Sequence, residues 1–382
     1  MLTVAENGML IGNQSTLGDK PVVEGGVDVD KGGPIGIVNA AEGTIHPATG
    51  TVLNEGDPVV TDNPFITSLV ITKDGEIVNS LDAASGLEAV SSLGIQAMTR
   101  RADSKLAEAV ARRTTAGAGL ESLDQPLSLW VDVSGERYKM DGLNGGGEFK
   151  ADMGYAVLAA DVVPAESWTV GAAVQYGTST LRSSVAGIRS EIDSWGFTLY
   201  GVKSFCDGAC RLVSELAYTM LDHDVTGAKT ALNAKVDPKI YSAGLRDEHT
   251  FGFGALKLTP SIGVRVSRLE TDAMSVGAVR VDDQDLTFTE VTISVVFSGF
   301  EQMLGGWTAS PYAKLSYAPT FGDKEIAFHS LSTDVLDANP FQGDFGLRLF
   351  KQNLELSADL QLGAGEYDSS AAGGRIGLRY AF

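Results

Sequence analysis

The sequence predicts an all-β fold, in which one helix precedes an antiparallel barrel of twelve strands, and three observations lead to it. From Leu127 onward, apolar and polar residues alternate within successive segments, as they do on the two faces of a strand. These segments run to roughly 10–15 residues, whereas strands of globular sheets usually have ~5–6. Finally, long and short connections alternate along the chain, which is the connectivity of hairpins in a closed sheet.

The alternation can be followed strand by strand. In the segment 354–363, Leu and Ala residues face one way, and Glu, Ser, Asp, Gln and Gly residues face the other. The polar faces predict a lumen that is either wetted or plugged, and aromatic residues near strand ends, such as Trp168 and Trp307, fit interfacial girdles. The twelve expected strands are 127–140, 149–163, 166–181, 189–203, 209–222, 236–249, 253–268, 285–299, 306–320, 342–351, 353–366 and 371–382.

The connections indicate a transmembrane barrel. Links after odd-numbered strands, such as GLNGGGE and LDHDVTGAKTALNAK, are long, whereas links after even-numbered strands, such as VVPAE and CDGA, are short. Outer-membrane barrels have long extracellular loops and short periplasmic turns, and a tilted strand of ~9–11 residues crosses the bilayer core. With an even number of strands, the chain enters the first strand and leaves the last one on the same side of the membrane, the periplasmic side.

The segment 84–115 predicts a helix, since it lacks Pro and is rich in helix-forming residues. Its apolar residues are expected to be spread around the helix rather than gathered in one stripe. Its C-terminal half is basic, in contrast to the acidic chain. It is either a solvated linker helix whose cations suit the helix dipole, or a helix threaded through an acid-lined pore. The cations are Arg100, Arg101, Lys105, Arg112 and Arg113.

Residues 1–83 are Gly-rich and have short strand-like runs such as GIVNAAEGTI, separated by turn residues. We expect a β-rich segment, either a β-solenoid, a small β-sandwich or an irregular linker. The chain is therefore divided into residues 1–83, a linker helix at 84–120 and a barrel at 121–382.

Composition excludes several function classes. The net charge of −20 argues against nucleic acid as a partner, because phosphates require a basic surface. No phosphate-binding motif or nucleophile elbow is present, so we expect neither an enzyme nor a cofactor. The four histidines do not have the spacing of metal ligands, and no metal site is expected; they are His46, His223, His249 and His329.

Two cysteines, Cys206 and Cys210, flank a short turn in KSFCDGACRL. A small disulfide loop is possible in the oxidising periplasm, and two free thiols are the alternative. The start, MLTVAENGML, lacks the basic and apolar regions of a signal peptide, although an outer-membrane protein must be exported. We therefore expect the sequence to be a fragment or its start to be misplaced, and the alternative is a protein that is not exported.

The final strand, GGRIGLRYAF, has one apolar and one polar face. Its apolar face is formed by Ile376, Leu378, Tyr380 and Phe382. A chain that ends on an aromatic residue after such a strand resembles the closing strand of bacterial outer-membrane barrels. The resemblance implies that these residues are read by the barrel-assembly machinery.

The order of features over residues 84–382 resembles the C-terminal translocator of autotransporters, the type V secretion family. After the helix and the strands come WTASPYAKLSYAPTFG, DFGLRLFKQNLELSADLQLG and the terminal GLRYAF. The resemblance implies a monomeric barrel in outer-membrane lipid, a helix in its pore, and a passenger at the cell surface. It also implies periplasmic chaperones as partners, and export driven by passenger folding.

Two other functions remain open from the sequence. A porin or channel with an N-terminal periplasmic domain would have an open pore and no role for residues 84–115. A surface adhesin would bind through its passenger, of which residues 1–83 are only a part. One branch of the family that the chain resembles cleaves its own linker helix at an Asn-Asn pair. Because no such pair occurs between residues 84 and 115, we do not expect self-cleavage by that route.

Overall fold

The computed structural model describes residue 91 and residues 93–115, 126–140, 148–183, 188–227, 233–276, 279–281, 283–328, 331–366 and 368–382, together with short strands before residue 80. The solenoid or sandwich expected for residues 1–83 lies outside the described residues. The short strands are β1 (Leu2–Val4), β2 (Leu10–Gly12), β3 (Val27–Val29), β4 (Gly36–Asn39), β5 (Ile45–Pro47), β6 (Pro58–Val59), β7 (Leu69–Ile71) and β8 (Ile77–Asn79).

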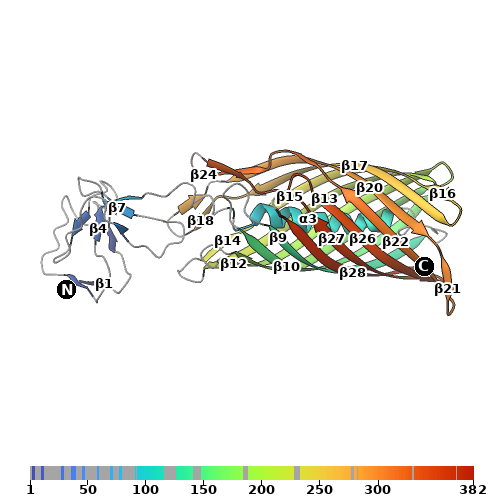
Figure 1. The fold of residues 1–382 in the computed structure, drawn as a ribbon, viewed down its shortest axis with the longest axis horizontal. Coiled ribbons are helices and arrows are strands. Elements are labelled where there is room, and N and C mark those ends of the chain that lie inside the picture. Colours follow the sequence, from blue (N-terminus) through green and yellow to red (C-terminus); the bar gives the residue numbers. More distant parts are fainter. Residues whose placement is uncertain are drawn as a thin grey trace.

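Within the described residues, twelve long strands form one closed antiparallel barrel, which confirms the predicted fold (Figure 1). Each pairs with the next along the chain, and the last pairs with the first. The strands are β9 (Leu127–Met140), β10 (Phe149–Ala165), β11 (Trp168–Ser183), β12 (Ile188–Phe205), β13 (Cys210–Gly227), β15 (Lys239–His249), β17 (Leu256–Thr271), β20 (Gln284–Gly299), β22 (Trp307–Tyr317), β26 (Phe341–Lys351), β27 (Leu354–Ala364) and β28 (Ser370–Ala381).

Short strands extend the hairpins at both ends of the barrel. At the short-turn end are β16 (Phe251–Phe253) and β21 (Gln302–Leu304), and the backbone leaves the extended conformation before β21, at Gly299 and Phe300, where φ is 106° and 55°. At the long-link end are β14 (Asn233–Val236), β18 (Met274–Val276), β19 (Val279–Val281), β23 (Thr320–Gly322), β24 (Glu325–Phe328) and β25 (Leu331–Asp334).

The barrel closes between its first and last strands, and the start of β9 and the end of β28 lie at the same rim. The backbone N–H of Phe382 donates to the carbonyl of Leu127 at 2.9 Å, and β28 pairs with β9 from Ser370 opposite Lys139 to Ala381 opposite Ser128. The short turns lie at this same rim, as the even strand count predicts. The long links lie at the other rim. We therefore call the two ends of the barrel the short-turn end and the long-link end.

The outer surface is an apolar band with aromatic residues toward its two edges. Leu158, Leu199 and Leu360 are among the most exposed leucines of the described residues, and all three face outward. Toward the long-link end, Tyr176 contacts Trp195, with ring centroids 4.8 Å apart. At the short-turn rim, Lys203 lies 5.0 Å from the ring centroid of Trp168, and Lys351 lies 5.7 Å from that of Trp307. This exterior is typical of a transmembrane barrel.

Helix α3 (Ile95–Thr114) lies inside the barrel (Figure 1). It begins after Gly94, whose φ is 61° and where an added Cβ would lie 2.5 Å from the side chain of Leu181. Only glycine meets both demands, which sets the start of α3 well inside the predicted segment. Leu93 and Ile95 pack against Ile188 and Val225 near the long-link end. Among the described residues, no helix combines the length and the apolar character needed to cross a membrane.

Candidate functional site

The apolar face of α3 packs against the inner surface of β10 to β13, which we call the apolar wall. The helix contributes a continuous stripe of buried side chains, Met98, Ala102, Leu106, Ala109 and Val110. The expectation that apolar residues are spread around the helix is therefore wrong. Alanines at two positions complete the stripe, and a small apolar residue in such a position is easily overlooked in a sequence.

The polar strand faces predicted a wetted or plugged lumen, and the apolar wall adds to it an apolar sector that the sequence did not indicate. The inward-facing residues Met153, Tyr155 and Val157 of β10 are buried and apolar, although they face the lumen. On β12, an added Cβ at Gly196 would lie 2.9 Å from the side chain of Leu106, so glycine lets the helix approach closely. In this sector the lumen is occupied by the helix rather than by water, and apolar side chains are accordingly stable on both sides.

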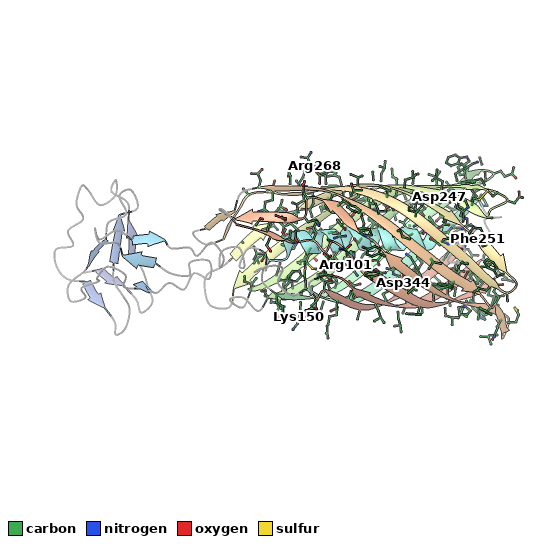
Figure 2. All side chains as sticks on the ribbon, turned by 45° about the horizontal axis from the view of Figure 1, so that its top comes forward. Arg101, Lys150, Asp247, Phe251, Arg268 and Asp344 are labelled. Carbon is green, nitrogen blue, oxygen red and sulfur yellow. A yellow bond between two sulfur atoms is a disulfide. The ribbon has the colours of Figure 1, made fainter. Side chains whose placement is uncertain are left out.

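The opposite face of α3 is charged and contacts the inner surface of β9, β28 and β27, which we call the charged wall. The guanidinium of Arg101 donates to both carboxylate oxygens of Glu136 on β9, at 2.6 and 2.5 Å. The ammonium of Lys105 lies 2.5 Å from the same carboxylate and 2.9 Å from Glu108, one turn along the helix. Figure 2 shows Arg101 inside the barrel.

Farther toward the short-turn rim, Arg112 joins two strands of the charged wall. Its guanidinium pairs with Asp132 on β9 and, at 3.0 Å, with Asp359 on β27. Arg375, on β28 between these strands, pairs with Asp132 at 3.3 Å and with Glu108 of the helix at 2.9 Å. The helix is thus tied to both strands of the closing pair, β9 and β28.

The remaining two cations of the helix also pair with barrel acids. Arg113 pairs with Asp161 on β10, and its Nε donates to that carboxylate at 3.2 Å. Arg100 pairs with Glu290 on β20 at 2.7 Å and donates to the backbone carbonyl of Asp337 at 2.6 Å. All five cations singled out in the sequence therefore face carboxylates of the barrel, three of them on the charged wall.

In one ion pair the charges are reversed, since the helix supplies the acid, Asp103, and the barrel supplies the base. Asp103 accepts from Arg265 on β17 at 2.8 Å and from the hydroxyl of Ser242 on β15 at 2.9 Å. Sequence reasoning missed Asp103 and the wall acids Asp132 and Glu136, whereas it placed Asp359 on the polar face of its strand. The signal for the wall acids was available, because Asp132 and Glu136 stand at inward positions between outward-facing Val131, Val133 and Gly135.

On its third side the helix does not reach the barrel, and a cavity of about 210 Å³ remains. The helix presents mostly small residues to it, Ala97, Ser104, Ala107 and Ala111, and the barrel presents charged residues such as Glu215 and Lys314. A cavity with such a polar lining can hold water. Within the described residues, His, Cys, Asp and Glu side chains do not gather in threes that could hold a metal.

The terminal strand has the two faces that its sequence predicts. Ile376, Leu378, Tyr380 and Phe382 are exposed on the outside of the barrel, and the rings of Tyr380 and Phe382 lie 4.8 Å apart. Arg375 points into the lumen.

Cys206 and Cys210 form a disulfide across the turn between β12 and β13, at the short-turn rim. Of the two alternatives left open by the sequence, the structure has the bonded pair.

Comparison with known proteins identifies the same class of barrel. Residues 129–367 match the family model described as the autotransporter beta-domain. The chain is similar to the translocator domain of the autotransporter NalP from Neisseria meningitidis, at 17% identity and a TM-score of 0.57, covering 74% of this chain and 98% of that one. No curated relative matches the sequence.

Two further solved structures share the fold. One is the beta domain of the Bordetella autotransporter BrkA, at 17% identity and a TM-score of 0.56, covering 67% of this chain and 100% of that one. The other is the transport unit of the autotransporter AIDA-I from Escherichia coli, at 16% identity and a TM-score of 0.55, covering 74% of this chain and 98% of that one.

Proposed function

The chain belongs to the autotransporter family, as an outer-membrane translocator that exports a passenger, and on that premise we propose that helix α3 remains in the pore as a plug after export. The observation that carries the proposal is the pairing of all five helix cations with carboxylates of the barrel wall. A charge buried without a partner is costly, so a helix with this sequence is stable in the lumen only opposite these acids.

The direction of the helix supports the same proposal. Its N-terminus packs at the long-link end, and its C-terminus reaches Asp161 near the rim where β9 begins. The N-terminal end of α3 therefore lies at the long-link end, which in outer-membrane barrels faces the outside. We assign residues 1–83 to the passenger, 84–120 to the linker and 121–382 to the translocator.

The outward face of β28 suits recognition during assembly. We propose that Ile376, Leu378, Tyr380 and Phe382 are read by the barrel-assembly machinery while the chain, escorted by periplasmic chaperones, is inserted as a monomer. Support comes from their exposure on the strand that closes the barrel. Replacing Phe382 by Ser should slow insertion into vesicles that contain the machinery, and unchanged insertion would contradict this assignment.

The plug is tested by single-channel conductance in planar bilayers. The full chain is compared with a chain that begins near Gly119 and thus lacks the helix. We expect a small conductance for the full chain and a severalfold larger one without the helix. Equal and large conductances would contradict the plug and favour a porin. Heat-modifiable migration on gels provides the control that both chains have folded as barrels.

A further inference from the structure

Four basic residues form a row across neighbouring strands on the outside of the barrel, near its long-link end. The strand register places Lys139 of β9 opposite Lys150 of β10, Lys150 opposite Arg182 of β11, and Arg182 opposite Arg189 of β12. We call these four residues the basic row. Lys150, Arg182 and Arg189 are exposed, and Figure 2 shows Lys150 projecting outward.

Such a row is unfavourable by itself. Side chains directly opposite on neighbouring strands lie ~4.5–5.5 Å apart at Cβ, and like charges there repel. On the far side of the barrel, the corresponding positions carry both signs of charge. Lys239 of β15 faces Glu270 of β17, which in turn faces Asp285 of β20, and Arg268 pairs with Asp285 at 3.0 Å. The basic row therefore carries a single sign of charge across four neighbouring strands, whereas the far side carries both.

The carboxylates near Lys150, Arg182 and Arg189 leave these three cations available. Lys150 lies 3.3 Å from Glu148, Arg182 lies 3.0 Å from Asp152, and Arg189 lies 3.0 Å from Glu191. Both partners of each pair are solvent-exposed, and exposed pairs are weak, so these cations can turn toward a stronger anion. A phosphate is such an anion, since it accepts charge-assisted and bidentate hydrogen bonds from arginine.

The position of the basic row along the membrane normal indicates which kind of molecule supplies the phosphate. Arg182 lies six residues beyond Tyr176 of the outward-facing aromatic pair, which is about 20 Å along the strand. At the ~35–45° tilt of such strands, this is about 15 Å along the membrane normal. Because the long-link end faces the outside, the row lies beyond the acyl chains of the outer leaflet, at the level of sugar headgroups that carry phosphates and carboxylates.

We propose that the basic row binds the phosphorylated sugar headgroup of lipopolysaccharide in the outer leaflet. One phosphate can bridge two neighbouring cations of the row, which relieves their repulsion and anchors that side of the barrel in the leaflet. The proposal rests on the outer-membrane localisation and is independent of whether α3 plugs the pore.

The test measures binding of purified rough lipopolysaccharide to the full chain refolded in nonionic detergent, by native mass spectrometry over a concentration series. The variant K150Q/R182Q removes two charges from the row. The matched control K239Q/R268Q removes two charges from the far side. We expect K150Q/R182Q to bind at least about tenfold more weakly, because it loses charge-assisted contacts, and the control to stay within about twofold. Heat-modifiable migration verifies that both variants fold.

Binding of K150Q/R182Q within twofold of the unchanged chain would overturn the proposal, as would an equal loss in both variants. Phosphatidylglycerol micelles and inorganic phosphate distinguish the source of the anion. Unchanged binding of these two probes by K150Q/R182Q supports a glycolipid site. A loss of their binding equal to that of lipopolysaccharide would overturn the glycolipid assignment and leave an unspecific anion patch.

Discussion

The apolar wall and the charged wall hold the same helix by different physical means. Against β10 to β13, Leu106 and its neighbours exclude water, an interaction that is strong but has little directional preference. Against β9, β28 and β27, Arg101, Lys105 and Arg112 meet carboxylates at defined positions. Apolar contact therefore keeps the helix in the lumen, whereas the ion pairs select its rotation about its axis and its position along the barrel.

The two walls also differ in what a substitution leaves behind. Removing one partner of a buried ion pair leaves an uncompensated charge, whereas shortening an apolar side chain leaves a cavity. The largest expected effects therefore belong to the charged wall, although its net contribution to stability is smaller than the number of its contacts suggests.

The largest effect is expected for Asp132→Ala. Asp132 is buried and pairs with both Arg112 and Arg375, so its removal leaves two cations without this carboxylate. We expect the free energy of unfolding to fall by about 3–5 kcal/mol. The measurement is a urea titration of the full chain refolded in detergent. A loss below about 1 kcal/mol would mean that the charged wall does not hold the helix.

The next effect is expected for Leu106→Ala in the apolar wall. Leu106 is fully buried over Gly196, and a cavity at this position should lower the free energy of unfolding by about 2–4 kcal/mol. The same titration measures it. If this loss exceeded that of Asp132→Ala, the ranking of the two walls proposed above would be reversed.

A substitution on the third side of the helix, which faces the cavity, should change the single-channel conductance rather than the free energy of unfolding. Ala107→Trp places a large side chain in the remaining space of about 210 Å³, and we expect the residual single-channel conductance of the full chain to fall severalfold. Leu158→Trp on the lipid-facing surface is the control and should leave the conductance unchanged. An unaltered current in Ala107→Trp would place the ion path elsewhere.

The smallest effect is expected for Arg137→Gln, on the same strand as Asp132 but on its outer face. The Arg137 side chain is 77% exposed and pairs with Asp152 at 2.8 Å. An exposed ion pair contributes little, so the free energy of unfolding should change by less than about 1 kcal/mol. A change as large as that of Asp132→Ala would show that burial does not separate the two faces of β9.

Much of the fold could be read from local patterns. Alternation in β11 and β27 identifies their outward faces, and the lengths of the links identify the two rims. The basic half of α3 is also visible in the sequence. Its partners are not, because Glu136, Asp161 and Glu290 come from three strands that only the barrel register brings around one helix.

The strands, their faces, the presence of a helix before them and the chain order of the parts could thus all be predicted from the sequence. These follow from interactions within a few residues, through a strand period of two and the propensities of a helix. In contrast, the division of the lumen into an apolar sector along β10 to β13 and a charged sector along β9, β28 and β27 is visible only in the folded barrel. That division depends on which sector of the barrel the rotated helix faces, and this is settled by contacts between residues far apart in the chain, such as Lys105 with Gln361.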